Sequence, residues 1–239
     1  MPDALVIQKG LWVCTLALQA ALVLRILGEN LLYGFRWFAA YLAAEVASGL
    51  VLIWTPQTSA VYFHAWNLTQ PALCFLRLMV GWEVVRRLVR ARPHPRPHML
   101  AAASILLGIC LAALSLELEL GLLRHASWRY SVLLMNRAVW TSIAIMIAML
   151  WAAGTIRPAP LDRNTILHAR LLFAFAAVET SRYIVMASSH GHYIASANIA
   201  SLLLQCLLFI LWISGLKTDA EVEHVPEPEL TPAARGAAA

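Results

Sequence analysis

The stretch AVWTSIAIMIAMLWAAGTI, residues 138–156, decides the fold of this chain. Its nineteen residues lie between Arg137 and Arg157 and contain no charged side chain, and that length matches one membrane thickness for an α-helix. A helix is expected because hydrocarbon offers no hydrogen-bond partner to an open backbone, and because the run is too continuous for a barrel strand. The stretch therefore predicts a transmembrane helix.

Six further apolar runs resemble this one. They are Gly10–Leu27, Trp37–Trp54, Ala65–Val85, Met99–Leu116, Leu171–Met186 and Tyr193–Ile213. The composition agrees, with 61% hydrophobic and 13% charged residues, whereas soluble domains have about 25% charged residues. We predict an all-α, polytopic bundle of seven transmembrane helices over residues 1–215. Residues 216–239 are acidic and rich in proline and alanine, and we expect a disordered cytoplasmic tail there.

The basic residues predict how the bundle is oriented. With the N-terminus outside, the outer side receives four of them and the inner side receives twelve. The inner group is Arg25, Arg36, Arg86, Arg87, Arg90, Arg92, Arg96, Arg157, Arg163, Arg170, Lys217 and Arg235. Because cytoplasmic loops carry the excess of Lys and Arg, we predict an outer N-terminus and a cytoplasmic C-terminus in the inner or plasma membrane.

Several classes of function are disfavoured by the sequence. The only lysines, Lys9 and Lys217, lie at helix ends, which disfavours a retinal Schiff base. The four cysteines lie far apart in apolar runs and suggest neither a disulfide framework nor a metal site. We find no HExxH, GxSxG or phosphate-binding glycine loop, so an enzyme ranks last, and we expect no cofactor and no catalytic residue. The net charge of +5 is expected to face lipid headgroups in the bilayer rather than nucleic acid.

Charged side chains inside the hydrocarbon are the first candidates for function, because burying them is costly. Four lie within the predicted spans: Glu45, Arg77, Glu179 and Arg182. Glu45, Arg77 and Glu179 each lie nine residues from the nearest arginine at the predicted inner boundary. At a rise of about 1.5 Å per residue, all three would lie roughly 13 Å from that boundary, near the bilayer midplane.

Three charges at one depth can meet inside the bundle. Arg77 can bind a carboxylate through two parallel hydrogen bonds, which suits a buried pair, and we expect it to contact Glu45. The second carboxylate then pairs with Arg182, one turn from Glu179, or stays protonated. A protonatable glutamate there can bind a cationic or polar ligand or couple to protons. The alternative is a structural clamp that only fixes helix packing, and the sequence alone favours the clamp over a functional site.

Polar and small residues also repeat at helical spacing. The third span carries one such face: Asn67, Gln70, Cys74, Arg77 and Gly81. The last span carries another: Asn198, Ser201 and Gln205. Both faces should point inward, either to line a hydrated site or to bond between helices. The fourth span has the small-xxx-small spacing of close helix packing at Ser104, Gly108 and Ala112.

Four features together resemble a known group of proteins. They are the aromatic starts of the second and third spans, Trp37–Tyr41 and Tyr62–Trp66, with Glu83 and Glu179. They are similar to a loose group of uncharacterised bacterial seven-helix membrane proteins, which includes the seven-helix sensory regions that precede some histidine kinases. The resemblance implies the fold and a sensory role. Because no output domain follows the last span, signalling would need a separate partner.

Two functions follow from these observations. The leading hypothesis is a non-enzymatic, sensor-like module that binds a small-molecule ligand, or a membrane or cytoplasmic protein partner. Its predicted polar core is Glu45, Arg77, Glu179, Arg182, Gln70, Asn67, Asn198 and Gln205. The alternative is a small proton-coupled transporter or channel that uses the same carboxylates as proton carriers.

Overall fold

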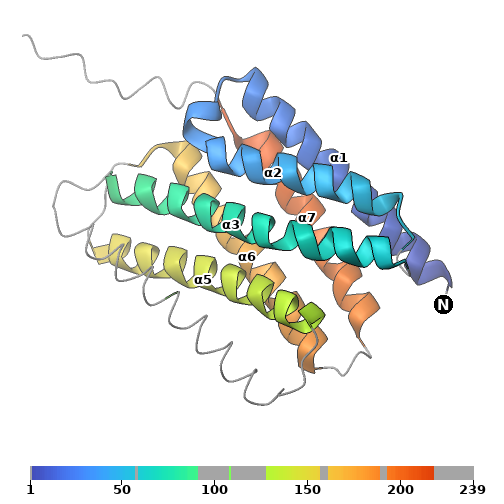
Figure 1. Ribbon diagram of the computed structural model, residues 1–239. Coiled ribbons are helices and arrows are strands. Elements are labelled where there is room, and N and C mark those ends of the chain that lie inside the picture. Colours follow the sequence, from blue (N-terminus) through green and yellow to red (C-terminus); the bar gives the residue numbers. More distant parts are fainter. Residues whose placement is uncertain are drawn as a thin grey trace, which may run out of the picture.

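The computed structural model describes residues 2–56, 59–90, 108, 128–156, 161–188 and 193–217, and within them the chain is all-α, without strands. The helices are α1 (Pro2–Gly28), α2 (Leu32–Ile53), α3 (Ala60–Arg90), α5 (Trp128–Ile156), α6 (Arg163–Ser188) and α7 (Ile194–Gly215). They lie alongside one another in one bundle (Figure 1). Of the predicted fourth span, Met99–Leu116, only Gly108 is among the described residues, and it packs against Ser142 of α5.

The described helices form a closed ring. In ring order, α1 packs on α2, α2 on α3, α3 on α5, α5 on α6, α6 on α7, and α7 again on α1. Helices α2 and α6 run in the opposite sense to α1, α3, α5 and α7, so the starts of these four helices lie with the ends of α2 and α6 (Figure 1). We call this the N-terminal end of the bundle. The ring encloses an interior to which every described helix can contribute side chains.

Five of the described helices are long and apolar enough to cross a membrane, which indicates a multi-pass membrane protein. They are α1, α2, α3, α5 and α7. Their outward faces are apolar, with leucines such as Leu68 and Leu203 largely exposed. Helix α6 falls outside this group, because its first turns carry Arg163, His168 and Arg170 and its second half carries further charges.

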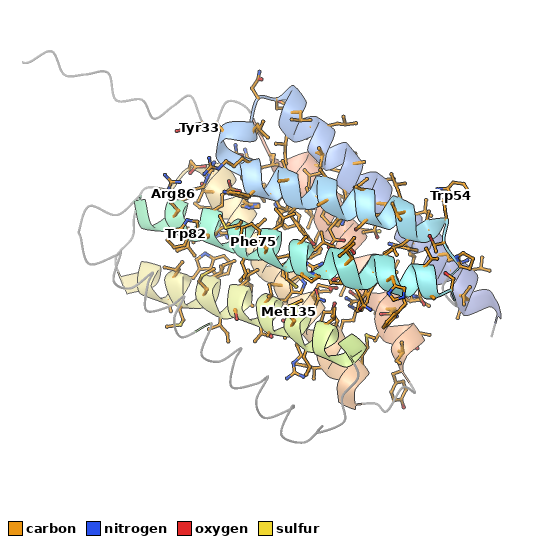
Figure 2. The ribbon with its side chains drawn as sticks, viewed as in Figure 1. Tyr33, Trp54, Phe75, Trp82, Arg86 and Met135 are labelled. Carbon is orange, nitrogen blue, oxygen red and sulfur yellow. The ribbon has the colours of Figure 1, made fainter. Side chains whose placement is uncertain are left out.

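Exposed aromatic residues mark both ends of α2. Tyr33 is 97% exposed at one end and Trp54 is 86% exposed at the other (Figure 2). Twenty-one residues of helix separate them by about 32 Å, close to the roughly 30 Å of bilayer hydrocarbon. Because Tyr and Trp favour the two membrane–water interfaces, these residues agree with a helix that crosses the membrane.

Helix α2 is broken near its start, and a carboxylate from α3 binds the break. Phe35 has non-helical angles, φ −126° and ψ 33°. The two carboxylate oxygens of Glu83 accept hydrogen bonds from the backbone N–H groups of Trp37 and Phe38, at 3.4 and 3.2 Å. Glu83 therefore acts as a helix cap supplied by another helix, and a carboxylate is favourable there because a helix start carries partial positive charge.

The half of the bundle away from the N-terminal end is filled by an aromatic layer. We use that name for Phe35, Phe38, His168 and Trp212, whose rings contact one another. All four are buried, and the indole nitrogen of Trp212 donates to His168 Nδ1 at 3.2 Å. This layer closes the ring interior at that end.

Residues 216 and 217, which lie beyond the predicted boundary at residue 215, pack against the bundle. Leu216 is fully buried, and Arg25 of α1 donates to its carbonyl at 2.8 Å. Asn164 of α6 likewise bonds the backbone of Lys217. The predicted tail at 216–239 otherwise lies outside the described residues.

Candidate functional site

A cavity of about 310 Å³ occupies the ring interior at the N-terminal end of the bundle. All six described helices contribute to its wall. Leu5 and Lys9 in the first turns of α1 line the cavity and are exposed, so the cavity opens at this end. Its inner wall includes Trp140 and Phe175, which lie between the cavity and the aromatic layer.

The first charged group on the wall is centred on Arg77 of α3. Its Nη2 atom lies 2.5 Å from Glu45 Oε1 of α2, and the Tyr41 hydroxyl donates to the same oxygen at 3.0 Å. Its Nη1 atom donates to the side-chain oxygen of Asn136 on α5. The predicted Arg77–Glu45 contact is thus present, but the two parallel hydrogen bonds to one carboxylate are not. The guanidinium of Arg77, on α3, instead bonds to α2 through one nitrogen and to α5 through the other.

The second charged group joins α6 to α7. Arg182 Nη2 lies 2.6 Å from Glu179 Oε2, and Arg182 Nη1 donates to Asn198 at 3.4 Å. The other Glu179 oxygen accepts from Gln205 at 2.7 Å and from Ser201 at 3.0 Å. The predicted pairing of the second carboxylate with Arg182 is present.

Seven of the eight residues predicted from the sequence line this one cavity. They are Glu45, Arg77, Glu179, Arg182, Gln70, Asn198 and Gln205. Asn67 is the exception, since it is half-buried on the same face of α3 but does not line the cavity. That this group binds a ligand stays a prediction.

Several residues of the site were not predicted. Asn136 lies just before the uncharged run that begins at residue 138, and so outside every predicted span. Gln19 and Trp140 lie inside apolar runs, where one polar side chain barely changes the mean hydropathy. Both are buried and line the cavity, at 4% and 2% exposure. The available signal was helical spacing, because Gln19 lies four residues after Thr15, another wall residue.

The wall combines aromatic rings with paired charges. Aromatic rings cover the charged groups: Arg77 lies over the rings of Tyr41 and Trp140, and Arg182 lies over Tyr183, at 4.5 to 5.6 Å. Among the described residues, no group of three His, Cys, Asp or Glu side chains is placed to hold a metal ion. The carboxylates are already occupied by arginine, amide and hydroxyl donors.

Comparisons of this chain with protein families, with curated proteins and with solved structures gave no match.

Proposed function

We propose that this chain is a non-enzymatic seven-helix membrane module that binds a small ligand in its interior cavity. The cavity itself is the observation that carries the proposal. Its volume of about 310 Å³ lies at the lower end of small-molecule sites, which measure about 300–1,000 Å³. Its wall brings seven aromatic side chains together with twelve polar or charged ones, so it is more polar than a typical small-molecule site and suits a polar ligand.

The closed end of the cavity favours a binding module over a channel or transporter. A transporter must offer its site to both sides of the membrane in turn. Here the aromatic layer fills the interior beyond the cavity, and Trp212 and His168 are bonded to each other within it. Opening a path would require separating these rings, whereas binding from the N-terminal end requires no such movement.

The topology belongs to the same proposal. We take α6 and the predicted span Met99–Leu116 as the remaining two crossings, with the N-terminus outside and the C-terminus in the cytoplasm. The charges of α6 support this, because Glu179 and Arg182 face the cavity and pair there. In this orientation the cavity opens to the outside, as a sensory role of the kind implied by the histidine-kinase resemblance requires.

Native mass spectrometry of the full-length protein, released from its own membranes, tests the proposal. We expect a stoichiometric small molecule to remain bound. Ser48→Phe should abolish retention, because Ser48 lines the cavity and the larger ring would occupy it. Ser214→Phe is the matched control: both hydroxyls bond a carbonyl of their own helix, but Ser214 is exposed and outside the cavity.

Two results would contradict a binding module. One is a bare protein in both the parent and Ser214→Phe forms. The other is pH-dependent solute flux in liposomes that Glu45→Gln or Glu179→Gln abolishes, which would establish the transporter instead.

A further inference from the structure

The two carboxylates of the cavity wall are bonded unequally. Both oxygens of Glu179 accept hydrogen bonds from neighbouring side chains. At Glu45, by contrast, Arg77 and the Tyr41 hydroxyl both bond to Oε1. Glu45 Oε2 has no partner among the described residues, and it is not one of their unpartnered atoms that are closed off from solvent. It is therefore an accessible acceptor.

This open oxygen belongs to a side chain that faces the cavity. Glu45 lies on the inward face of α2 with Tyr41 and Ser48, which also line the cavity. The outward face of the same turns is formed by the exposed Ala43 and Ala47. Since 22% of the Glu45 side chain is exposed on the inward face, a molecule in the cavity can reach its carboxylate.

Gln70 of α3 offers a second open polar group. It lines the cavity, its amide makes no hydrogen bond within the described part of the chain, and neither amide atom is closed off from solvent. Gln70 lies seven residues before Arg77, about 10 Å nearer the cavity opening. Ser48 lies between these levels, three residues or about 4.5 Å from Glu45 along the adjacent α2. The open groups thus follow one another along one side of the cavity.

The charges deep in the cavity are already matched among the described wall residues. Arg77 pairs with Glu45, and Arg182 pairs with Glu179. An ammonium group at Glu45 Oε2 would share one carboxylate with the Arg77 guanidinium, after passing Lys9 at the opening. A ligand carboxylate at the same place would meet the Glu45 carboxylate directly. Because like charges repel strongly in a medium of low dielectric constant, this end suits an uncharged donor.

Deepening the proposed function, on which this step rests, we infer that the ligand is a small uncharged molecule that ends in a hydrogen-bond donor, of the kind carried by primary amides. The donor binds Glu45 Oε2, and hydrogen bonds to charged groups are stronger than those between neutral groups. The other polar atoms bond the Gln70 amide, which both donates and accepts. An apolar part lies against Trp66, one turn before Gln70 on the same face of α3.

Isothermal titration calorimetry of the full-length protein in detergent tests this ligand class. Benzamide is the uncharged probe, and benzoate and benzylamine are its anionic and cationic counterparts. We expect benzamide to bind at least about tenfold more tightly than either of them. Ser48→Phe gives the background for nonspecific uptake into the detergent, because its ring would occupy the cavity.

Glu45→Gln tests the open oxygen itself. Since the Arg77 guanidinium has only donors, the glutamine oxygen must stay towards it, and the NH₂ group then takes the place of Oε2. The parent should prefer benzamide to acetophenone, which accepts but does not donate, by about tenfold, and Glu45→Gln should remove that preference. Glu29→Gln is the matched control, since it alters a carboxylate that pairs with an arginine outside the cavity and should leave the preference unchanged.

Gln70→Met gives a second measurement that leaves the ion pair intact. It keeps the length of the side chain and removes the amide, so benzamide should bind about fivefold more weakly. Benzamide binding that is unchanged in Gln70→Met, or a preference over acetophenone that persists in Glu45→Gln, would overturn the inference.

The remaining outcomes separate the ligand class from the site. A charged probe that binds more tightly than benzamide, with that binding lost in Ser48→Phe, would overturn the uncharged ligand and leave the interior binding site standing. An absence of benzamide binding up to about 10 mM would also overturn it. The proposed function is judged separately by the retained mass of the native protein.

Discussion

At the scale of single residues, a charge inside this bundle is stabilised by several neighbours at once. Arg77 contacts a carboxylate, an amide oxygen and two aromatic rings, each from a different residue. Glu179 is held by an arginine, an amide and a hydroxyl. Removing one of these side chains therefore takes a bonding partner from several others. The resulting loss in the free energy of unfolding should exceed that of a single hydrogen bond.

A double-mutant cycle on Arg77 and Glu45 measures this dependence. Arg77→Met should lower the free energy of unfolding by about 3–5 kcal/mol, because the Glu45 carboxylate loses its cation and Asn136 loses its charged donor. Glu45→Gln should cost less, since its side chain is 22% exposed. In the double variant we expect a coupling of about 1–3 kcal/mol, measured by SDS-induced unfolding in mixed micelles.

The half-exposed pair of Arg25 and Glu29 is the control, with side chains 32% and 37% exposed. The same cycle there should give a coupling of only about 0.3–0.5 kcal/mol. Simple additivity at Arg77 and Glu45 would show that their contact does not stabilise the bundle.

At the scale of helices, hydropathy predicts which segments are helical but not which side chains of neighbouring helices contact one another. The run at Trp37–Trp54 coincides with the regular part of α2, yet the helix begins at Leu32 and breaks at Phe35. The break depends on Glu83, which is 45 or more residues away in the chain. Spacing identified the inward faces of α3 and α7, because a face follows from one helix alone. Asn136, the partner of Arg77, could not be predicted, because a pairing depends on which helices become neighbours.

Replacing Glu83 tests the cap it provides to α2. Glu83→Leu should lower the free energy of unfolding by about 1–3 kcal/mol, because the N–H groups of Trp37 and Phe38 lose their acceptor. Hydrogen exchange at those two amides should become faster. Glu83→Gln should have a smaller effect, since its amide oxygen still accepts one bond. Unchanged exchange at both amides in Glu83→Leu would show that the carboxylate does not cap α2.

At the scale of the whole molecule, the orientation is open to a direct measurement. Pro56, in the connection after α2, is exposed at the N-terminal end of the bundle, and Lys217, after α7, is exposed at the opposite end. In a variant whose four cysteines are replaced by serine, a membrane-impermeant maleimide added to intact cells should label Pro56→Cys and not Lys217→Cys. Both should react once the membrane is permeabilised, and the reverse pattern in intact cells would place the N-terminus inside.

The aromatic layer also sets how the bundle responds to force. A close-packed interior has low compressibility and transmits strain, so the half around Phe38, His168 and Trp212 is stiff. The half that holds the cavity is compliant, because its side chains have unfilled volume beside them. For a molecule that enters the cavity, we therefore expect the helices to splay apart about the stiff half. The largest displacements should then fall at the N-terminal end and be directed sideways, against whatever lies beside the protein in the plane of the membrane.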